Sequence, residues 1–126
     1  AQCGAKEQMQ PLSDEVWKNL QQVFTGLQGN PEAVQAAGNL PVEQRFAKIA
    51  EVTGLLDFFA ARGLSAEQAR TCLSDPARID ALVKGSEAEA RKFEVTGTPT
   101  FVLNGKKLDV NTWEALEPLL QRAGAR

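Results

Sequence analysis

The residues that could carry reaction chemistry are few, and the two cysteines, Cys3 and Cys72, are the most reactive of them. They are far apart in the sequence, so they cannot form a Cys-x-x-Cys redox pair. The 126 residues contain no histidine and no tyrosine. A Ser-His-Asp or Cys-His nucleophile, a histidine base and a histidine-ligated metal are therefore excluded within this chain. What chemistry remains must come from the cysteines, from carboxylates or from backbone geometry.

The composition excludes several further classes of protein. Apolar residues make up 43% and charged residues 24%, and the formal net charge is -2, as in ordinary globular proteins. The sequence has no basic run suited to nucleic acid and no apolar stretch near the roughly 20 residues of a membrane span. Neither of the glycine-rich phosphate-binding patterns occurs. We therefore expect no nucleic-acid partner, no membrane span, no metal and no cofactor.

The first three quarters of the sequence has the pattern of helices. Ser13 is expected to cap the first helix, because acidic residues follow it. Ser65 with Gln68 fits a capping box, and Asp75 before Pro76 predicts the start of another helix. The length of the chain suits one compact domain, or a small domain with an appendage.

The pattern changes after Phe93. Residues 100–103, Thr-Phe-Val-Leu, favour a strand, and Asn104-Gly105 predicts a two-residue hairpin turn because both positions tolerate positive φ. Residues 106–108 form the return strand, and Asn111 is expected to cap a last helix. A single hairpin is marginal alone and leaves one strand edge bare. We therefore expect the missing strands of this sheet to come from an upstream segment or from another chain.

The segment 95–105, Val-Thr-Gly-Thr-Pro-Thr-Phe-Val-Leu-Asn-Gly, is the most specific feature of the sequence. With the helix before it and the hairpin, it resembles the cis-proline loop of the thioredoxin fold in its DsbA-like form, over about residues 55–122. The resemblance implies an α/β, thioredoxin-like fold of the DsbA type with an α-helical insertion. The chain itself would be mostly helical with one C-terminal β-hairpin. Residues 1–94 would be the mainly helical insertion region, and residues 95–126 the cis-proline loop, hairpin and last helix of the thioredoxin-like domain.

The resemblance also implies a function, that of a thiol-disulfide oxidoreductase or protein disulfide isomerase. Its substrates would be extended polypeptides, and it would exchange disulfides with redox partner proteins. In the family the peptide bond before the loop proline is cis, and the backbone of the preceding residue pairs with the substrate by β-augmentation. Pro99 and Thr98 match these positions. The alternative is an ordinary trans proline at the entry to a strand.

The chain departs from the family pattern in one important respect. Family members carry Cys-x-x-Cys at the start of the first helix, where the helix N-terminus lowers the pKa of the leading thiol. This chain has no such motif, so it holds no catalytic residue of that kind and is expected to be inactive alone. A start at Ala1 rather than at methionine favours a piece of a longer protein that supplies the missing active-site segment.

The resemblance is compatible with a structural disulfide between Cys3 and Cys72, since some DsbA-like proteins carry an additional bridge in their helical part. Such a bridge would suit a periplasmic or secreted protein. The alternative is two unpaired thiols that pack as small apolar side chains.

Other residues have simpler interpretations. Trp17 and Trp113 could line a ligand groove, but are expected to be half-buried helix anchors. Lys106 and Lys107 are expected to be a solvated pair that protects a strand edge.

Two other functions stay open. One is a redox-inactive, thioredoxin-like domain that binds peptides or acts as an adaptor. The other is a relative of the glutathione-transferase-kappa and isomerase group, which shares Val-x-Gly-x-Pro-Thr-Phe. That group usually continues with an aromatic-Gly-x-Asp stretch after the hairpin, whereas residues 107–111 here read Lys-Leu-Asp-Val-Asn.

Overall fold

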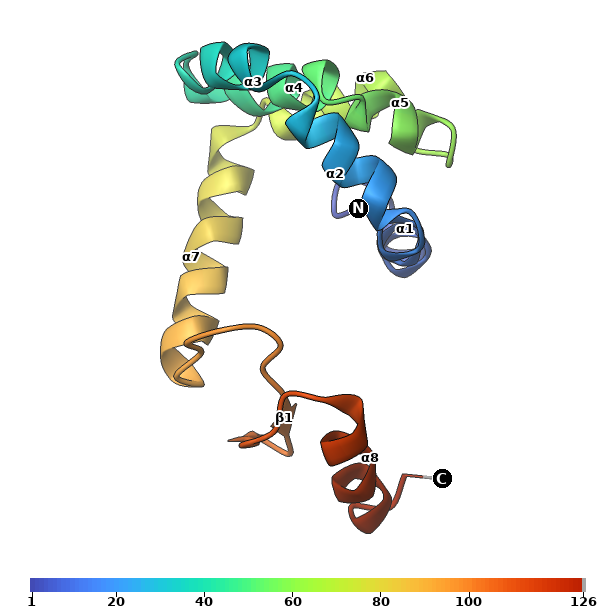
Figure 1. Cartoon of the computed structure of the whole chain (residues 1–126). Helices are drawn as coiled ribbons and strands as arrows, with labels where there is room; N and C mark the ends of the chain where they lie inside the picture. The colour runs from blue at the N-terminus through green and yellow to red at the C-terminus, as the bar shows by residue number, and fades with distance from the viewer. Residues whose placement is uncertain (126) are drawn as a thin grey trace. The chain divides into compact units, whose positions relative to one another are not determined.

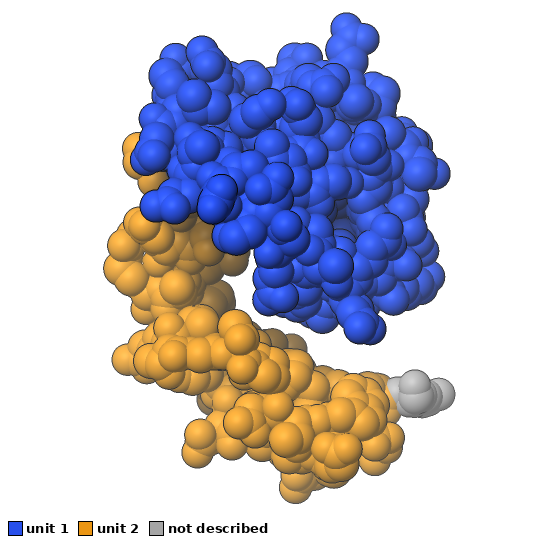
Figure 2. All heavy atoms as spheres, turned by 45° about the horizontal axis from the view of Figure 1, so that its top comes forward, with its two compact units in different colours: residues 1–80 blue, residues 81–126 orange. Residues whose placement is uncertain are grey.

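The computed structural model describes residues 1–125, and most of its regular structure is helical (Figure 1). The chain forms two compact units, residues 1–80 and the residues from 81 onward (Figure 2). The first unit holds the helices α1 (Lys6–Lys18), α2 (Leu20–Gln28), α3 (Pro31–Gly38), α4 (Val42–Val52), α5 (Leu55–Ala60) and α6 (Ala66–Leu73). Helix α7 (Pro76–Lys92) continues from the first unit into the second. The second unit also holds the strands β1 (Val102–Leu103) and β2 (Lys106–Lys107) and the helix α8 (Trp113–Arg122).

Two of the four predicted helix caps are confirmed, and those at Ser13 and Asn111 are wrong. Ser65 Oγ accepts a hydrogen bond from the Gln68 amide at the start of α6, and Asp75 Oδ1 accepts from the amides that begin α7. The prediction for Ser13 is wrong, because α1 already begins at Lys6. Ser13 lies inside α1, where its hydroxyl donates to Met9 O at 2.8 Å, so it does not compete with the helix.

The core of the first unit lies where α1, α4, α5 and α6 meet. Helix α4 packs against α3, α5 and α6, which places it at the centre of this unit. Leu64, in the turn between α5 and α6, is only 1% exposed. The other buried members of this core are Leu12, Ala50, Leu56 and Ala69. Each large side chain removed from water here stabilises the unit by about 1.5–3 kcal/mol.

Gly26 marks a close approach between α2 and the end of α4. A Cβ atom at Gly26 would collide with the backbone carbonyl oxygen of Thr53, the buried residue that follows α4. We expect Gly26→Ala to lower the free energy of unfolding by about 1–3 kcal/mol, because backbone cannot yield as a flexible side chain can.

The matched control for Gly26 is Gly85→Ala in α7, where an added Cβ meets nothing within 4 Å. That change should raise stability by up to about 1 kcal/mol, because alanine is the better helix former. Urea unfolding followed by circular dichroism at 222 nm measures both effects. Equal stability of Gly26→Ala and the unchanged protein would contradict the close approach.

An ion pair ties α1 to the end of α5. Arg62 Nε lies 3.1 Å from Glu15 Oε2, and Arg62 Nη1 donates to Phe58 O at 2.9 Å. The guanidinium carbon also lies 3.8 Å from the centre of the Phe58 ring, as in a cation–π contact. The hydrogen bond from Arg62 is the main cause that holds the pKa of the Glu15 carboxyl below its usual range.

The second unit buries much less than the first. Leu116 of α8 is buried, whereas Leu82, Val83, Val95, Val102 and Trp113 are all more than a third exposed. The prediction of half-buried tryptophan anchors is wrong, because Trp17 is 72% and Trp113 58% exposed.

Helix α8 differs from the prediction at its start. Thr112 Oγ1, and not the Asn111 side chain, accepts from the Ala115 amide at 3.4 Å. Adjacent Asn and Thr are both good N-cap residues, so the sequence alone leaves this choice open. Among residues 1–125, no helix is both long and apolar enough to cross a membrane.

Candidate functional site

The loop of residues 95–101 connects α7 to β1, and its entry is fixed by the end of α7. The Val95 amide donates to Ala90 O at 2.9 Å, and the Glu94 amide donates to Arg91 O. Glu94 has φ of 50°, in the left-handed region that a helix commonly uses to end. The chain therefore leaves α7 in a defined direction.

Thr98 and Pro99 lie at the middle of this loop, and the peptide bond between them is cis. Both residues are exposed. The Thr100 hydroxyl donates to Gly97 O at 2.6 Å across the cis bond. The turn is therefore held by a hydrogen bond of its own, and Thr98 is an exposed residue.

The hairpin after the loop has the predicted turn. Asn104 has φ of 50° and Gly105 has φ of 80°, which are the positive values that a type I′ turn requires. Strands β1 and β2 are antiparallel, with Val102 opposite Lys107. The Leu108 amide donates to Phe101 O at 2.8 Å, which extends the pairing by one step.

The loop and the hairpin together line an open depression of about 330 Å³. It is formed by residues 96–100 and by residues 107–111. Because β1 and β2 run antiparallel, the chain before β1 and the chain after β2 lie at the same end of the hairpin. Polar groups dominate the lining, so the depression suits a polar ligand.

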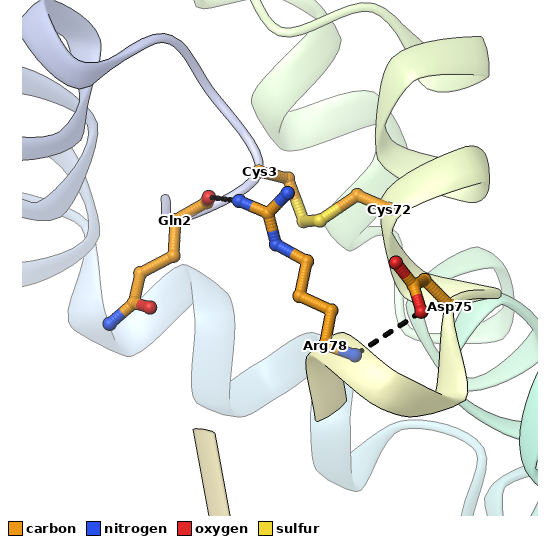
Figure 3. Close-up of a disulfide and its surroundings, with 5 residues drawn as sticks. All are labelled: Gln2, Cys3, Cys72, Asp75 and Arg78. Carbon is orange, nitrogen blue, oxygen red and sulfur yellow. Dashed lines mark hydrogen bonds between the residues drawn. A yellow bond between two sulfur atoms is a disulfide. The ribbon is translucent and has the colours of Figure 1, made fainter. Parts of the chain in front are cut away.

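The second predicted site, the cysteine pair, lies in the first unit. Cys3 and Cys72 form a disulfide with Cα atoms 5.6 Å apart (Figure 3). Cys72 belongs to α6, and Cys3 lies in the segment before α1, where it packs against the core. The bridge therefore ties the N-terminal segment to the last helix of this unit.

Arg78 makes a second connection beside the bridge. Its Nη2 donates to Gln2 O at 2.6 Å, and its backbone amide donates to Asp75 Oδ1 (Figure 3). No local motif predicts this contact, because the two residues that it joins are 76 positions apart in the chain.

The described part of the chain contains no redox nucleophile. Both cysteines are in the bridge, and no free cysteine is present among residues 1–125. Within the same range, no group of three or more His, Cys, Asp or Glu residues could hold a metal ion. Neither thiol of the described residues is therefore free to act as a nucleophile at the loop.

Lys107 of β2 makes a contact at the entry of the loop that the sequence does not predict. It was expected to be solvated, and it is exposed, but its Nζ donates to Glu94 O at 2.7 Å. These two groups come together only through the register of the hairpin and the position at which α7 ends. No sequence motif specifies either of them.

Comparison with known proteins identifies the fold. A family model described as thioredoxin matches residues 7–122. The chain belongs to the thioredoxin family. This confirms the thioredoxin-like, DsbA-type fold expected from the loop, and the described chain is mostly helical with one small C-terminal hairpin. A search of curated proteins gives no match.

A solved thioredoxin-fold structure resembles nearly the whole chain. The crystal structure of a protein-disulfide isomerase from Novosphingobium aromaticivorans is 26% identical, with a TM-score of 0.84. The match covers 98% of this chain and 64% of that protein. The chain therefore spans less than two thirds of the length of the isomerase that it resembles.

Proposed function

We propose that the chain is part of a DsbA-like thiol-disulfide oxidoreductase or protein disulfide isomerase that acts on extended polypeptides. The observation that carries this proposal is the exposed Thr98-Pro99 loop beside the hairpin, in a chain that belongs to the thioredoxin family. Thr98 would pair through its backbone with a substrate strand, and Pro99 would shape the loop that presents it. The similarity to a protein-disulfide isomerase supports the reaction class.

The redox Cys-x-x-Cys would lie in a segment outside this chain. Two observations support this part of the proposal. Cys3 and Cys72 are joined to each other in the first unit, so neither is available beside Thr98 as an attacking thiolate. The isomerase of similar fold is also longer than the match, which covers 64% of it.

Surfaces of the second unit support the proposal that further strands complete its sheet. Strand β1 pairs only with β2 within residues 1–125, so its other edge offers unpaired backbone groups. Val102 on β1 and Leu82 and Val83 on α7 expose apolar surface. An upstream segment, or another chain, would supply the missing strands and cover these side chains.

In terms of the family, residues 1–94 would form the helical insertion region, and residues 95–126 the C-terminal part of the thioredoxin-like domain. The compact units divide between residues 80 and 81, inside α7, whereas the change of sequence pattern follows the end of that helix. The disulfide supports a periplasmic or secreted location, where redox partner proteins would renew the active cysteines.

Substitutions of Thr98 test whether the main chain of the loop binds substrate. Thr98→Pro removes the amide hydrogen, and Thr98→Val keeps it while removing the hydroxyl. In the protein that carries its upstream segment, Thr98→Pro should weaken binding of an extended, cysteine-containing peptide about fivefold, because one hydrogen bond is worth about 1 kcal/mol. Thr98→Val should bind within about twofold of the unchanged protein, since a main-chain contact does not read the side chain.

Fluorescence anisotropy of a labelled peptide measures these affinities. Equal weakening by both variants would assign the contact to the threonine side chain. Unchanged affinity of Thr98→Pro would show that the loop does not bind substrate through its backbone.

A further inference from the structure

The carbonyl of Glu94 is held by a side chain from β2. Residue 94 lies two positions beyond Lys92, the last residue of α7, so its carbonyl is outside the hydrogen-bond ladder of the helix. Lys107 Nζ donates to this oxygen at 2.7 Å, from a residue 13 positions further along the chain. A cation near a helix C-terminus also interacts favourably with the helix dipole. Strand β2 therefore contributes the group that holds the chain just after the end of α7.

The hydrogen bond from Lys107 to Glu94 restrains the entry of the loop. Other hydrogen bonds restrain its middle and its exit. The Thr100 hydroxyl holds the middle through Gly97 O. The exit is paired between Phe101 and Leu108, directly beside Lys107. Only the entry has a residue other than glycine at positive φ, a conformation that the surrounding structure must maintain.

We propose that Lys107 is a positioning residue for the Thr98-Pro99 loop. Its ammonium group holds the Glu94 carbonyl and so fixes the direction in which the chain enters the loop. Lys107 is itself held in place by the pairing of β2 with β1. This inference rests on the proposed function, because it takes the Thr98 backbone to be the group that binds substrate.

Lys106 supplies a matched control for this inference. It has the same charge and lies on the same strand, but its side chain has no partner among residues 1–125. Successive side chains of a strand point to opposite faces, so Lys106 cannot replace Lys107 at Glu94. Lys107→Met keeps an unbranched side chain one heavy atom shorter and removes the donor, and Lys107→Arg keeps a cationic donor.

Amide hydrogen exchange of the 126-residue chain gives the first readout. In Lys107→Met the Val95 amide, which donates to Ala90 O at the end of α7, should exchange about threefold faster, as expected for the loss of one exposed hydrogen bond. Lys107→Arg should restore slow exchange, and Lys106→Met should not change it. The urea midpoint of unfolding should be the same in all three. Unchanged exchange of Val95 in Lys107→Met overturns the proposal.

Peptide affinity of the protein with its upstream segment gives the second readout. Lys107→Met should raise the dissociation constant of a labelled, cysteine-containing extended peptide about threefold, with Lys107→Arg and Lys106→Met near the unchanged value. If Thr98→Pro weakens binding and Lys107→Met does not, the positioning role is overturned while the proposed function stands. If neither variant changes binding, the proposed function fails, and the role of Lys107 in substrate binding fails with it.

Discussion

Replacing both Cys3 and Cys72 by alanine is expected to lower the free energy of unfolding of residues 1–80 by about 4 kcal/mol. The bridge closes a loop over a sequence separation of 69 residues, and a loop of this size restricts the unfolded chain by about that amount. This corresponds to roughly a thousandfold change in the folding equilibrium, a large share of the 5–15 kcal/mol that holds most domains folded. Alanine suits this test because Cys3 packs against the apolar core, where serine would add an unpartnered hydroxyl.

Urea unfolding with and without a reductant measures this effect. Reductant should shift the unchanged protein to the midpoint of the double alanine variant and should leave that variant unaffected. Alkylation under native, non-reducing conditions provides an independent check. Modification of both thiols in the folded protein, or unfolding curves that coincide with and without reductant, would show that Cys3 and Cys72 are not joined in solution.

The second large effect concerns activity. The 126-residue chain alone is expected to show no turnover in the dithiol-driven reduction of insulin, at any protein concentration that raises the rate of a thioredoxin-family enzyme. Disulfide exchange needs a thiolate nucleophile, and both cysteines of the chain are held in the bridge. The double alanine variant has no disulfide, so it is the matched control for slow exchange through the bridge between Cys3 and Cys72. A rate above that of the uncatalysed reaction in both proteins would show that a nucleophile has been missed.

Local chemistry was enough to predict the hairpin, whereas the cis-proline loop was expected from the resemblance to the family. The Asn-Gly pair at positions 104 and 105 has narrow backbone preferences that hardly depend on the rest of the fold. The left-handed angles of Asn104 and Gly105 follow directly from these preferences. The same reasoning located the cap at Ser65, where the hydroxyl meets the amide three residues later.

The failures have a common physical cause. Ser13 has the right type for an N-cap, but a serine inside a helix can satisfy its hydroxyl through the carbonyl four residues earlier, as it does here with Met9. The expectation that Trp17 is a half-buried anchor rested on its residue type, whereas its side chain is 72% exposed at the C-terminal end of α1. Residue type is a local signal, and the packing of neighbouring helices decides whether a residue caps a helix or is buried.

Contacts between distant parts of the chain were out of reach of the sequence alone. The spacing of Cys3 and Cys72 does not specify a bridge, which depends on the N-terminal segment meeting α6. The hydrogen bond from Lys107 to Glu94 likewise depends on the register of the hairpin and on where α7 ends. Both contacts depend on how the helices and strands pack, which no local sequence pattern specifies.

The most direct test of the central claim is to measure insulin reduction by the polypeptide produced together with the coding sequence immediately upstream of Ala1. We expect an upstream Cys-x-x-Cys, turnover by the longer polypeptide, and loss of that turnover when the first of those cysteines is replaced by serine. An uninterrupted upstream stretch without a Cys-x-x-Cys, or a longer polypeptide that carries the motif and shows no turnover, would contradict the account.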